Sequence, residues 1–165
     1  MFFFDEARFG THSKLGHGWF ERGKRTSVKV KLGFQNFYVF SAVSMKSGQD
    51  ISYIMPSVNT QAMNEFLACM SKDLGQKQAI VVMDCAGWHR SKDLKIPENI
   101  EIVLLPPYSP ELNPAEKLWQ YIKSHTIKNK VYETLYELEN VICEFIKNLD
   151  PRAILVTCSV NHYLS

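Results

Sequence analysis

The sequence predicts an α/β fold in which a mixed sheet of five strands is flanked by helices. Two continuous apolar runs of strand length, Ala79–Met83 and Ile100–Leu105, are typical of strands covered on both faces, as in parallel sheets. Asn36–Ser44 and Asp50–Met55 are rich in β-forming residues and are separated by a turn signal, so they predict an antiparallel hairpin. Segments with helical spacing lie between and after these strands, which favours helices packed on the sheet.

The first strand is expected at the very start of the chain. Met1–Phe4 is short, apolar and aromatic, and it predicts a buried strand that ends near Asp5 and Glu6. A central strand in this position suggests that another segment normally precedes the domain. The next stretch, Phe9–Leu32, is rich in Gly, His and basic residues and predicts a long loop with a strand around Trp19–Glu21.

Three helices are predicted from the spacing of apolar residues. The first begins at Thr60 and is closed by Gly75. The second is expected directly after Asn113-Pro114, because Asn at the N-cap and Pro at the first helical position form a strong start signal. The third covers Val131–Leu149, and a short apolar tail follows it.

Composition places the chain among ordinary globular domains. Its 165 residues fit one domain, and 45% hydrophobic with 22% charged residues argues against wholesale disorder. The net charge of +2 does not by itself indicate nucleic acid, but the basic residues gather in two groups that would suit a polyanion or form solvated faces. The groups are Arg8, Lys14, Arg22, Lys24, Arg25, Lys29 and Lys31, and Lys117, Lys123, Lys128 and Lys130.

Cysteine spacing and hydropathy indicate a cytoplasmic protein with no membrane contact. The four cysteines are widely spaced and form no CxxC pair, so we expect reduced thiols rather than disulfides or a zinc site. The apolar N-terminus lacks a basic region and is soon interrupted by a carboxylate, unlike a signal peptide. No apolar stretch approaches transmembrane length.

Three carboxylates follow predicted elements that end at one edge of the sheet. Asp5 ends the first strand, Asp84 ends the fourth, and Glu116 lies in the first turn of the helix after the fifth. The ligand crevice of an open α/β sheet lies at this edge, where the three side chains could meet. Carboxylates brought together repel one another unless a cation compensates, and oxygen-only ligands suit Mg²⁺ or Mn²⁺. Two such ions about 3.5–4 Å apart would support an in-line displacement at phosphorus.

Each carboxylate also has a structural interpretation. Asp5 could be a strand-ending turn residue, and Asp84 could form an Asx-type turn. Glu116 follows Asn113 by three residues, which is the spacing of a capping box. Taken singly these interpretations are at least as good, and it is the joint placement that favours a metal site. A first-turn glutamate could serve both roles.

At these residues the sequence closely resembles the DDE transposases of the mariner-like superfamily, in particular their bacterial insertion-sequence branch. The resembling segments are Phe4–Glu6, Val82–Asp84 with Ala86–His89, and Leu105–Pro114 with Glu116–Trp119. The interval between Asp84 and Glu116 is slightly shorter than is usual in the family. Cys85 stands where the family commonly carries Asn or Gly, which puts the local turn in question.

The resemblance implies a ribonuclease H-like fold and a metal-dependent activity on DNA. Asp5, Asp84 and Glu116 would be the catalytic triad and would hold two Mg²⁺ or Mn²⁺ ions. DNA would be cleaved at transposon ends, and the freed 3′ hydroxyl would then attack target DNA. A homodimer that acts on the bacterial nucleoid is implied as well.

The resemblance covers residues 1–165 as a catalytic domain alone. Such transposases normally carry N-terminal helix-turn-helix modules, and we expect that this region is absent from the chain. The chain would then be half of a split reading frame, a remnant or a trimmed protein. Without such modules, its DNA contacts should be mostly to phosphates.

Several basic and aromatic side chains are candidates for contacts with DNA. The predicted nucleic-acid-binding residues are Arg22, Lys24, Arg25, His89, Lys117 and Lys123. His89 could instead orient a metal-bound water or be a plain surface residue. Trp19 and Trp88 could stack on unpaired bases.

Two aromatic residues near Glu116 are predicted to serve packing. Tyr108 should pack to fix the proline-rich loop before the helix, and Trp119 should belong to the core.

Two other functions are compatible with these motifs. One is a nuclease of the same fold without strand transfer, and the other is a decayed remnant that only binds DNA or dimerises. The intact acidic set argues against decay.

Overall fold

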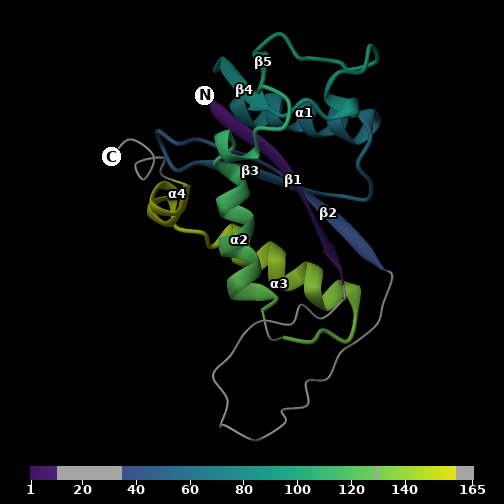
Figure 1. The fold of residues 1–165 in the computed structure, drawn as a ribbon, viewed down its shortest axis with the longest axis vertical. Helices are drawn as coiled ribbons and strands as arrows, with labels where there is room; N and C mark the ends of the chain where they lie inside the picture. The colour runs from purple at the N-terminus through teal and green to yellow at the C-terminus, as the bar shows by residue number, and fades with distance from the viewer. Residues whose placement is uncertain (11–34, 129, 159–165) are drawn as a thin grey trace, which may run out of the picture.

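The computed structural model describes residues 1–10, 35–128 and 130–158. Over these residues a five-stranded sheet carries helices on both faces (Figure 1), which confirms the predicted mixed α/β architecture. The strands are β1 (Phe2–Gly10), β2 (Asn36–Val43), β3 (Asp50–Met55), β4 (Ala79–Met83) and β5 (Ile100–Leu104). The helices are α1 (Thr60–Leu74), α2 (Ala115–Thr126), α3 (Leu135–Lys147) and α4 (Pro151–Cys158), with short 3-10 turns at Gly87–His89 and Pro110–Leu112.

The sheet has the order β3-β2-β1-β4-β5, with β1 in the middle. Strand β1 is antiparallel to β2 and parallel to β4, and β4 is parallel to β5. Strands β2 and β3 form the predicted hairpin. They pair antiparallel, from Val43 opposite Asp50 to Tyr38 opposite Met55. Helix α1 begins at Thr60 and ends before Gly75, and α2 begins directly after Asn113-Pro114, as predicted.

The predicted end of the first strand is wrong. Strand β1 continues past Asp5 to Gly10, because β2 pairs with it from Phe3 onward. Its parallel pairing with β4 covers only Phe2 and Phe3. Continuing that register sets Asp5 level with Asp84, directly beyond the end of β4. Asp5 therefore lies within β1, beside the point where the neighbouring strand β4 has already ended.

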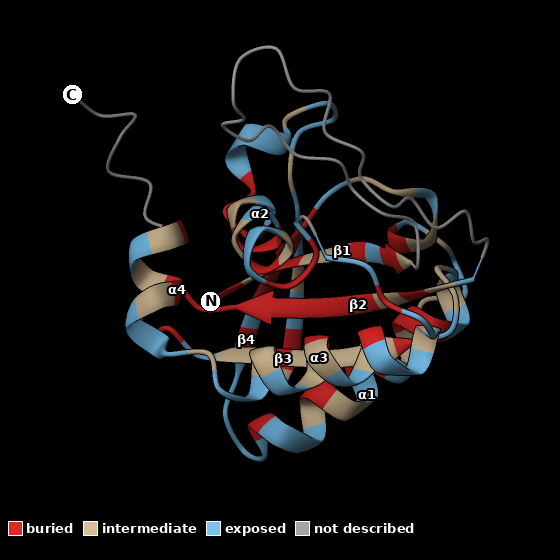
Figure 2. Ribbon diagram, turned by 90° about the horizontal axis from the view of Figure 1, so that it is seen from below, coloured by how far each residue is buried: buried red, intermediate tan, exposed pale blue. Residues whose placement is uncertain are grey.

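One face of the sheet is covered by α1. The phenylalanine rings of Phe4, Phe40 and Phe66 form the centre of this core, and the Phe4 and Phe66 centroids are 4.9 Å apart. Full burial of such a ring is worth about 1.5–3 kcal/mol. Figure 2 shows the buried residues concentrated on the strands and on the sides of the helices that face them.

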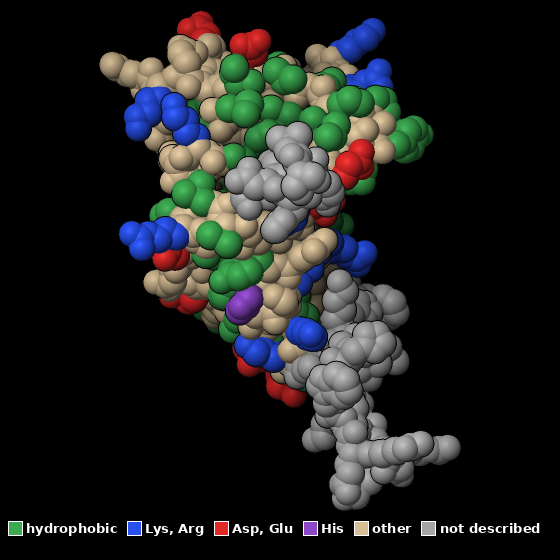
Figure 3. Space-filling view, turned by 60° about the vertical axis from the view of Figure 1, so that its left-hand side comes forward, with side chains coloured by type: hydrophobic (Ala, Val, Ile, Leu, Met, Phe, Trp, Pro, Cys, Tyr) green, Lys and Arg blue, Asp and Glu red, His purple; other side chains and the backbone are tan. Residues whose placement is uncertain are grey.

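The other face is covered by α2, α3 and α4, over β1 and β2. Leu118 and Ile122 of α2 and Leu138 of α3 lie in this core. Toward β4 and β5 the described helices leave the same face open, and Ile80 and Val103 are about two-fifths exposed there. In Figure 3 hydrophobic side chains gather in the upper half, which holds these two strands.

The C-terminal helices differ from the prediction. Helix α3 begins at Leu135, not at Val131, because the Thr134 side chain accepts a hydrogen bond from the Glu137 N–H (3.1 Å) and caps it there. The apolar tail after the third helix is a short helix, α4, whose buried Ile154 and Cys158 lie in the core with α2. No described helix is long and apolar enough to cross a membrane.

The predicted loop Phe9–Leu32 is described only at its start. Phe9 and Gly10 belong to β1. The rest of it, including the strand expected around Trp19–Glu21, lies outside the described residues.

Gly48, in the turn between β2 and β3, is expected to be intolerant of a side chain. Its φ is +69°, and a Cβ would lie 2.3 Å from the Pro151 carbonyl oxygen at the start of α4. Gly75 also has a positive φ, +60°, but a Cβ there would meet nothing within 4 Å. Gly75→Ala should therefore lose only the backbone term of about 1–2 kcal/mol. Gly48→Ala should lose distinctly more in urea unfolding, and equal losses would contradict the packing of α4 on this turn.

Candidate active site

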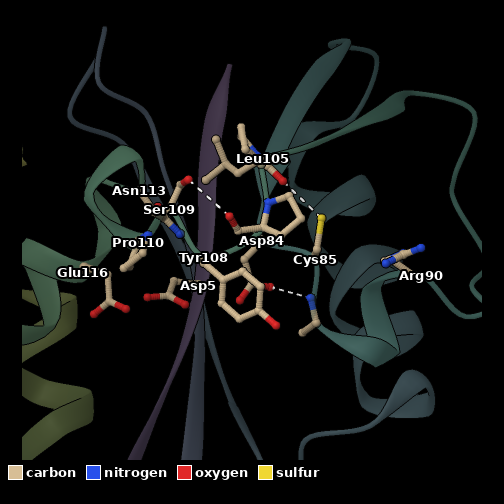
Figure 4. A pocket seen from close by; sticks show the side chains of 13 residues that line it. Asp5, Asp84, Cys85, Arg90, Leu105, Tyr108, Ser109, Pro110, Asn113 and Glu116 are labelled. Carbon is tan, nitrogen blue, oxygen red and sulfur yellow. Dashed lines mark hydrogen bonds between the residues drawn. The ribbon is translucent and has the colours of Figure 1, made fainter.

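The structure brings the three predicted carboxylates to one cleft. Asp5 projects from β1, Asp84 directly follows β4, and Glu116 lies in the first turn of α2. All three line a cavity of about 420 Å³, and Figure 4 shows Asp5 between the other two. Glu116 also borders an adjoining hollow of about 410 Å³. Three acids therefore line one cleft at the edge of the sheet beyond β4.

The start of α2 is attached to β1 by the side chain of Asn113. Its Nδ2 donates to the Phe4 carbonyl oxygen (2.9 Å), and its Oδ1 accepts from the Ala115 N–H (3.2 Å). Asn113 is buried, so these bonds are shielded from water. Phe4 directly precedes Asp5, and Asn113 precedes Glu116 by one helical turn. This one amide therefore sets the position of Glu116 relative to Asp5.

The expected capping box is not formed. Asn113 does cap the helix, but its own N–H donates to the Pro110 carbonyl oxygen (2.9 Å), where a boxed Glu116 would have accepted it. Glu116 is exposed at the cleft instead. The alternative role of Glu116 as a cap is therefore wrong in this state.

Asp5 is held from the side of α2. The Trp119 indole N–H donates to its Oδ2 (3.0 Å), and Trp119 is buried in the core as predicted. No sequence pattern predicts this hydrogen bond, because it joins residues far apart in the chain. It fixes one oxygen of Asp5 while the side chain still lines the cleft.

Asp84 forms the Asx-type turn that is its structural interpretation. Its Oδ1 accepts from the Ala86 N–H (3.0 Å) as an Asx turn does, and it also contacts His89 Nδ1 (2.8 Å). The side chain is still 57% exposed, so the turn and a place at the cleft coexist. The neighbouring Cys85 thiol donates to the Leu105 carbonyl oxygen (3.1 Å), which ties the ends of β4 and β5.

His89 is not a surface residue. It is only 4% exposed, and its ring packs on that of Phe4 in a T-shaped arrangement with centroids 5.4 Å apart. A direct contact with a DNA phosphate does not fit this burial, so that prediction is revised. Its Nε2 lies 3.7 Å from Oε2 of Glu6, a residue the sequence did not single out. Strand alternation explains this placement, because Asp5 and Glu6 point to opposite faces of β1.

The acidic cluster is strained electrostatically. Burial, then the charge of Glu116, raises the pKa of Asp5 to about 7. Burial, then the charge of Asp5, raises the pKa of Glu6 to about 8. Burial also lowers the pKa of His89, against the opposing influence of Asp84. A cation would offset the cost of ionising Asp5 and Glu6, which comes first from burial and then from neighbouring acids.

The described side chains do not form a closed cage for a single ion. Over the described ranges, no group of three His, Cys, Asp or Glu side chains is placed to hold one metal. Mg²⁺ normally takes one or two carboxylates and completes its shell with water and phosphate oxygens. The donor set fits open sites of that kind.

Two basic side chains flank the cleft. Arg90, which the sequence reasoning missed, is exposed and lines the same cavity as Asp84. Lys117 lines the adjoining hollow beside Glu116. Lys123 lies further along α2, with its Nζ 5.5 Å from the centre of the Phe9 ring. The predicted contacts Arg22, Lys24 and Arg25, like Trp19, lie outside the described residues.

The packing role predicted for Tyr108 is wrong. The side chain is fully exposed at the cleft, and its backbone has φ +58°. A positive φ is uncommon for a residue with a Cβ and is often found at functional sites. Trp88 is half-buried and packs beside His89.

Comparison with known proteins gives one family. The family model described as DDE superfamily endonuclease matches residues 1–139. The uncharacterized protein y4pE/y4sA of Sinorhizobium fredii is 35% identical over 107 residues, which are 64% of this chain and 79% of that protein. An uncharacterized 39 kDa protein of the insertion element IS630 from Shigella sonnei is 21% identical over 159 residues, which are 92% of this chain and 46% of that one.

Solved structures share the fold. The match to the Mos1 strand transfer complex has a TM-score of 0.74 at 15% identity, and it covers 95% of this chain and 50% of the Mos1 chain. The catalytic domain of Mos1 mariner transposase has a TM-score of 0.68 at 14% identity, with 95% and 74% covered. These neighbours confirm the ribonuclease H-like fold. The chain spans about half the length of the IS630 relative and of the Mos1 chain in that complex.

The raised carboxyl pKa values predict how stability depends on pH in metal-free buffer. The folded state keeps protons on Asp5 and Glu6 at pH values where the unfolded chain has lost them. Their contribution is therefore full below about pH 4 and is lost as the pH rises to about 8, so the free energy of unfolding should fall over this range. Urea unfolding with EDTA would measure it.

Glu6→Gln should flatten part of this slope, because the variant has no carboxyl to titrate. Glu101→Gln, on an exposed residue of β5, is the matched control and should keep the slope. Equal slopes in Glu6→Gln and the wild type would contradict the raised pKa.

Proposed function

The chain belongs to the DDE superfamily endonucleases, and we propose that it is the catalytic domain of a transposase. It would cleave DNA strands at transposon ends and join them to target DNA, using divalent metal ions. The observation that carries this proposal is the convergence of Asp5, Asp84 and Glu116 on one cleft. Likeness to Mos1 supports the fold, and the activity rests on the site.

The arrangement of the acids suits two ions rather than one. Asp5 lies between the others (Figure 4), so it would be shared, with Asp84 holding one ion and Glu116 the other. Mg²⁺ or Mn²⁺ fits the oxygen-only donors. Mos1 paired-end complexes have been solved with Mn and with Mg.

The side chains of this domain would hold the reacting groups in line. Bound ions would activate the attacking oxygen and stabilise the leaving 3′ oxygen at the phosphorus. The attacking oxygen would come from water during cleavage and from the freed 3′ hydroxyl during strand transfer. Asn113 and Trp119 would keep Glu116 and Asp5 in place, which supplies the positioning such reactions need.

DNA would be held mainly through its phosphates. Arg90 and Lys117 flank the acids on two sides and are our leading contacts, with Lys123 further along α2. On the face in Figure 3, Lys and Arg side chains are scattered among acidic ones and do not form one patch. Because the proposed contacts are to phosphates, binding should depend strongly on salt.

Sequence-specific reading of the transposon ends would come from a helix-turn-helix region outside these residues. A homodimer that acts on nucleoid DNA in the bacterial cytoplasm completes the proposal. Arg22, Lys24 and Arg25 stay within it as predicted phosphate contacts.

Removing either outer carboxylate should slow cleavage strongly without unfolding the domain. Asp84→Asn and Glu116→Gln should each slow Mn²⁺-dependent nicking of labelled DNA by at least about 100-fold, because metal stabilisation of the transition state is worth several kcal/mol. Glu111→Gln removes a nearby exposed carboxylate and should retain activity. Nicking that survives in both variants would count against the site.

The products decide between a transposase and a plain nuclease. With pre-cut transposon ends, target DNA and Mn²⁺, the domain should yield joined molecules that gel electrophoresis separates from fragments. Fragments alone would indicate hydrolysis without strand transfer. DNA binding without either product would indicate a non-catalytic remnant.

A further inference from the structure

Asp84 is held from the buried side of the sheet as well as from its own turn. We infer that His89, braced by Glu6, is a positioning residue that fixes the Asp84 carboxylate for metal binding. The inference rests on the proposed function, because it assigns a second layer of contacts to that same site. It adds two residues that are not among the three acids.

The contacts on Asp84 act on one of its oxygens. Oδ1 lies 2.8 Å from His89 Nδ1 and 3.0 Å from the Ala86 N–H, and Nδ1 is also 3.1 Å from the Asp84 carbonyl oxygen. With Nδ1 protonated, the ring donates to both acceptors, and the carboxylate loses its free rotation. The side chain stays 57% exposed, so its other oxygen remains accessible from the cleft.

The opposite edge of the imidazole faces Glu6. His89 Nε2 and Glu6 Oε2 lie 3.7 Å apart, beyond hydrogen-bond distance. With Nδ1 protonated, Nε2 is an acceptor, so a bond between them would require a protonated Glu6 carboxyl that donates to it. Both atoms are buried and have no hydrogen-bond partner within the described residues. Unpaired buried polar atoms cost about 1–3 kcal/mol each, so an apolar pair would stabilise the fold better. The arrangement is therefore better explained by function than by stability.

The alternation of side chains along β1 connects the acids in the cleft with the contacts on the buried side. Asp5 points into the cleft, and the next residue, Glu6, points to the buried side, where it meets His89. Two adjacent residues of one strand thus support the proposed metal site, one directly and one through His89 and Asp84. Carboxylates that bind metals are commonly oriented by such outer contacts, whose loss weakens metal affinity about 10–100-fold.

A purely structural role for His89 would be to fill space beside Phe4. Substitutions that separate volume from hydrogen bonding distinguish the two roles. His89→Leu keeps an apolar side chain in the space and removes the donor. His89→Asn places an amide near the position of Nδ1 and keeps the donor, whereas His89→Gln places it near Nε2.

The test is calorimetric titration of the full chain with Mn²⁺, which does not depend on DNA or activity. His89→Leu should weaken Mn²⁺ binding about 10–100-fold, and His89→Asn should recover most of the loss. Glu6→Met should weaken binding less, and it should add little in the His89→Leu background, because it acts through His89. His125→Leu, on an exposed histidine of α2, should bind as the wild type does.

Thermal unfolding in EDTA checks that each variant is folded. A folded His89→Leu that binds Mn²⁺ like the wild type would overturn the inference. If His89→Leu does not fold, His89→Asn is compared with His89→Gln. Equal Mn²⁺ affinities of these two variants would overturn the inference. A wild-type chain that binds no Mn²⁺ would instead count against the proposed metal site itself.

Discussion

The hydrogen bonds of the Asn113 side chain are the constraint on which the site depends. Asp5 and Glu116 lie far apart in the sequence, on β1 and α2, so tertiary contacts set their separation. One buried amide bonds both the Phe4 carbonyl and the first turn of α2. Each such bond contributes about 1 kcal/mol, but leaving a buried partner unpaired costs about 1–3 kcal/mol. The Asn113 amide thus contributes little to the stability of the fold, but it holds the start of α2, and with it Glu116, against β1.

The second constraint is the unequal length of the strands. Strand β4 stops at Met83, while β1 continues along β2, so Asp5 lies beyond the last parallel pair. An acid there reaches the cleft from a rigid strand rather than from a loop. The domain tolerates mutually repelling acids, the left-handed Tyr108 and unpaired buried atoms at this one edge. Local unfavourable terms of this kind are expected where function, not stability, selects the residues.

Much of the fold could be predicted because its signals are local. The apolar runs of β4 and β5, the hairpin and α1 follow from short windows of sequence, and the sheet-edge rule placed the acids together. Most of what failed depends on distant partners. The end of β1 is set by β2, and the burial of His89 by Phe4 and Glu6. The capping box failed for a local reason, because the Asn113 N–H donates to the Pro110 carbonyl oxygen. The exposure of Tyr108 depends on the path of the proline-rich loop, which no periodicity describes.

We propose that Asp5 would be shared between two cations, one beside Asp84 and one beside Glu116. Anomalous scattering from crystals soaked in Mn²⁺ tests it most directly. Two peaks are expected in the cleft about 3.5–4 Å apart, both next to Asp5. A cleft without anomalous signal, or a single ion that avoids Asp5, would contradict it.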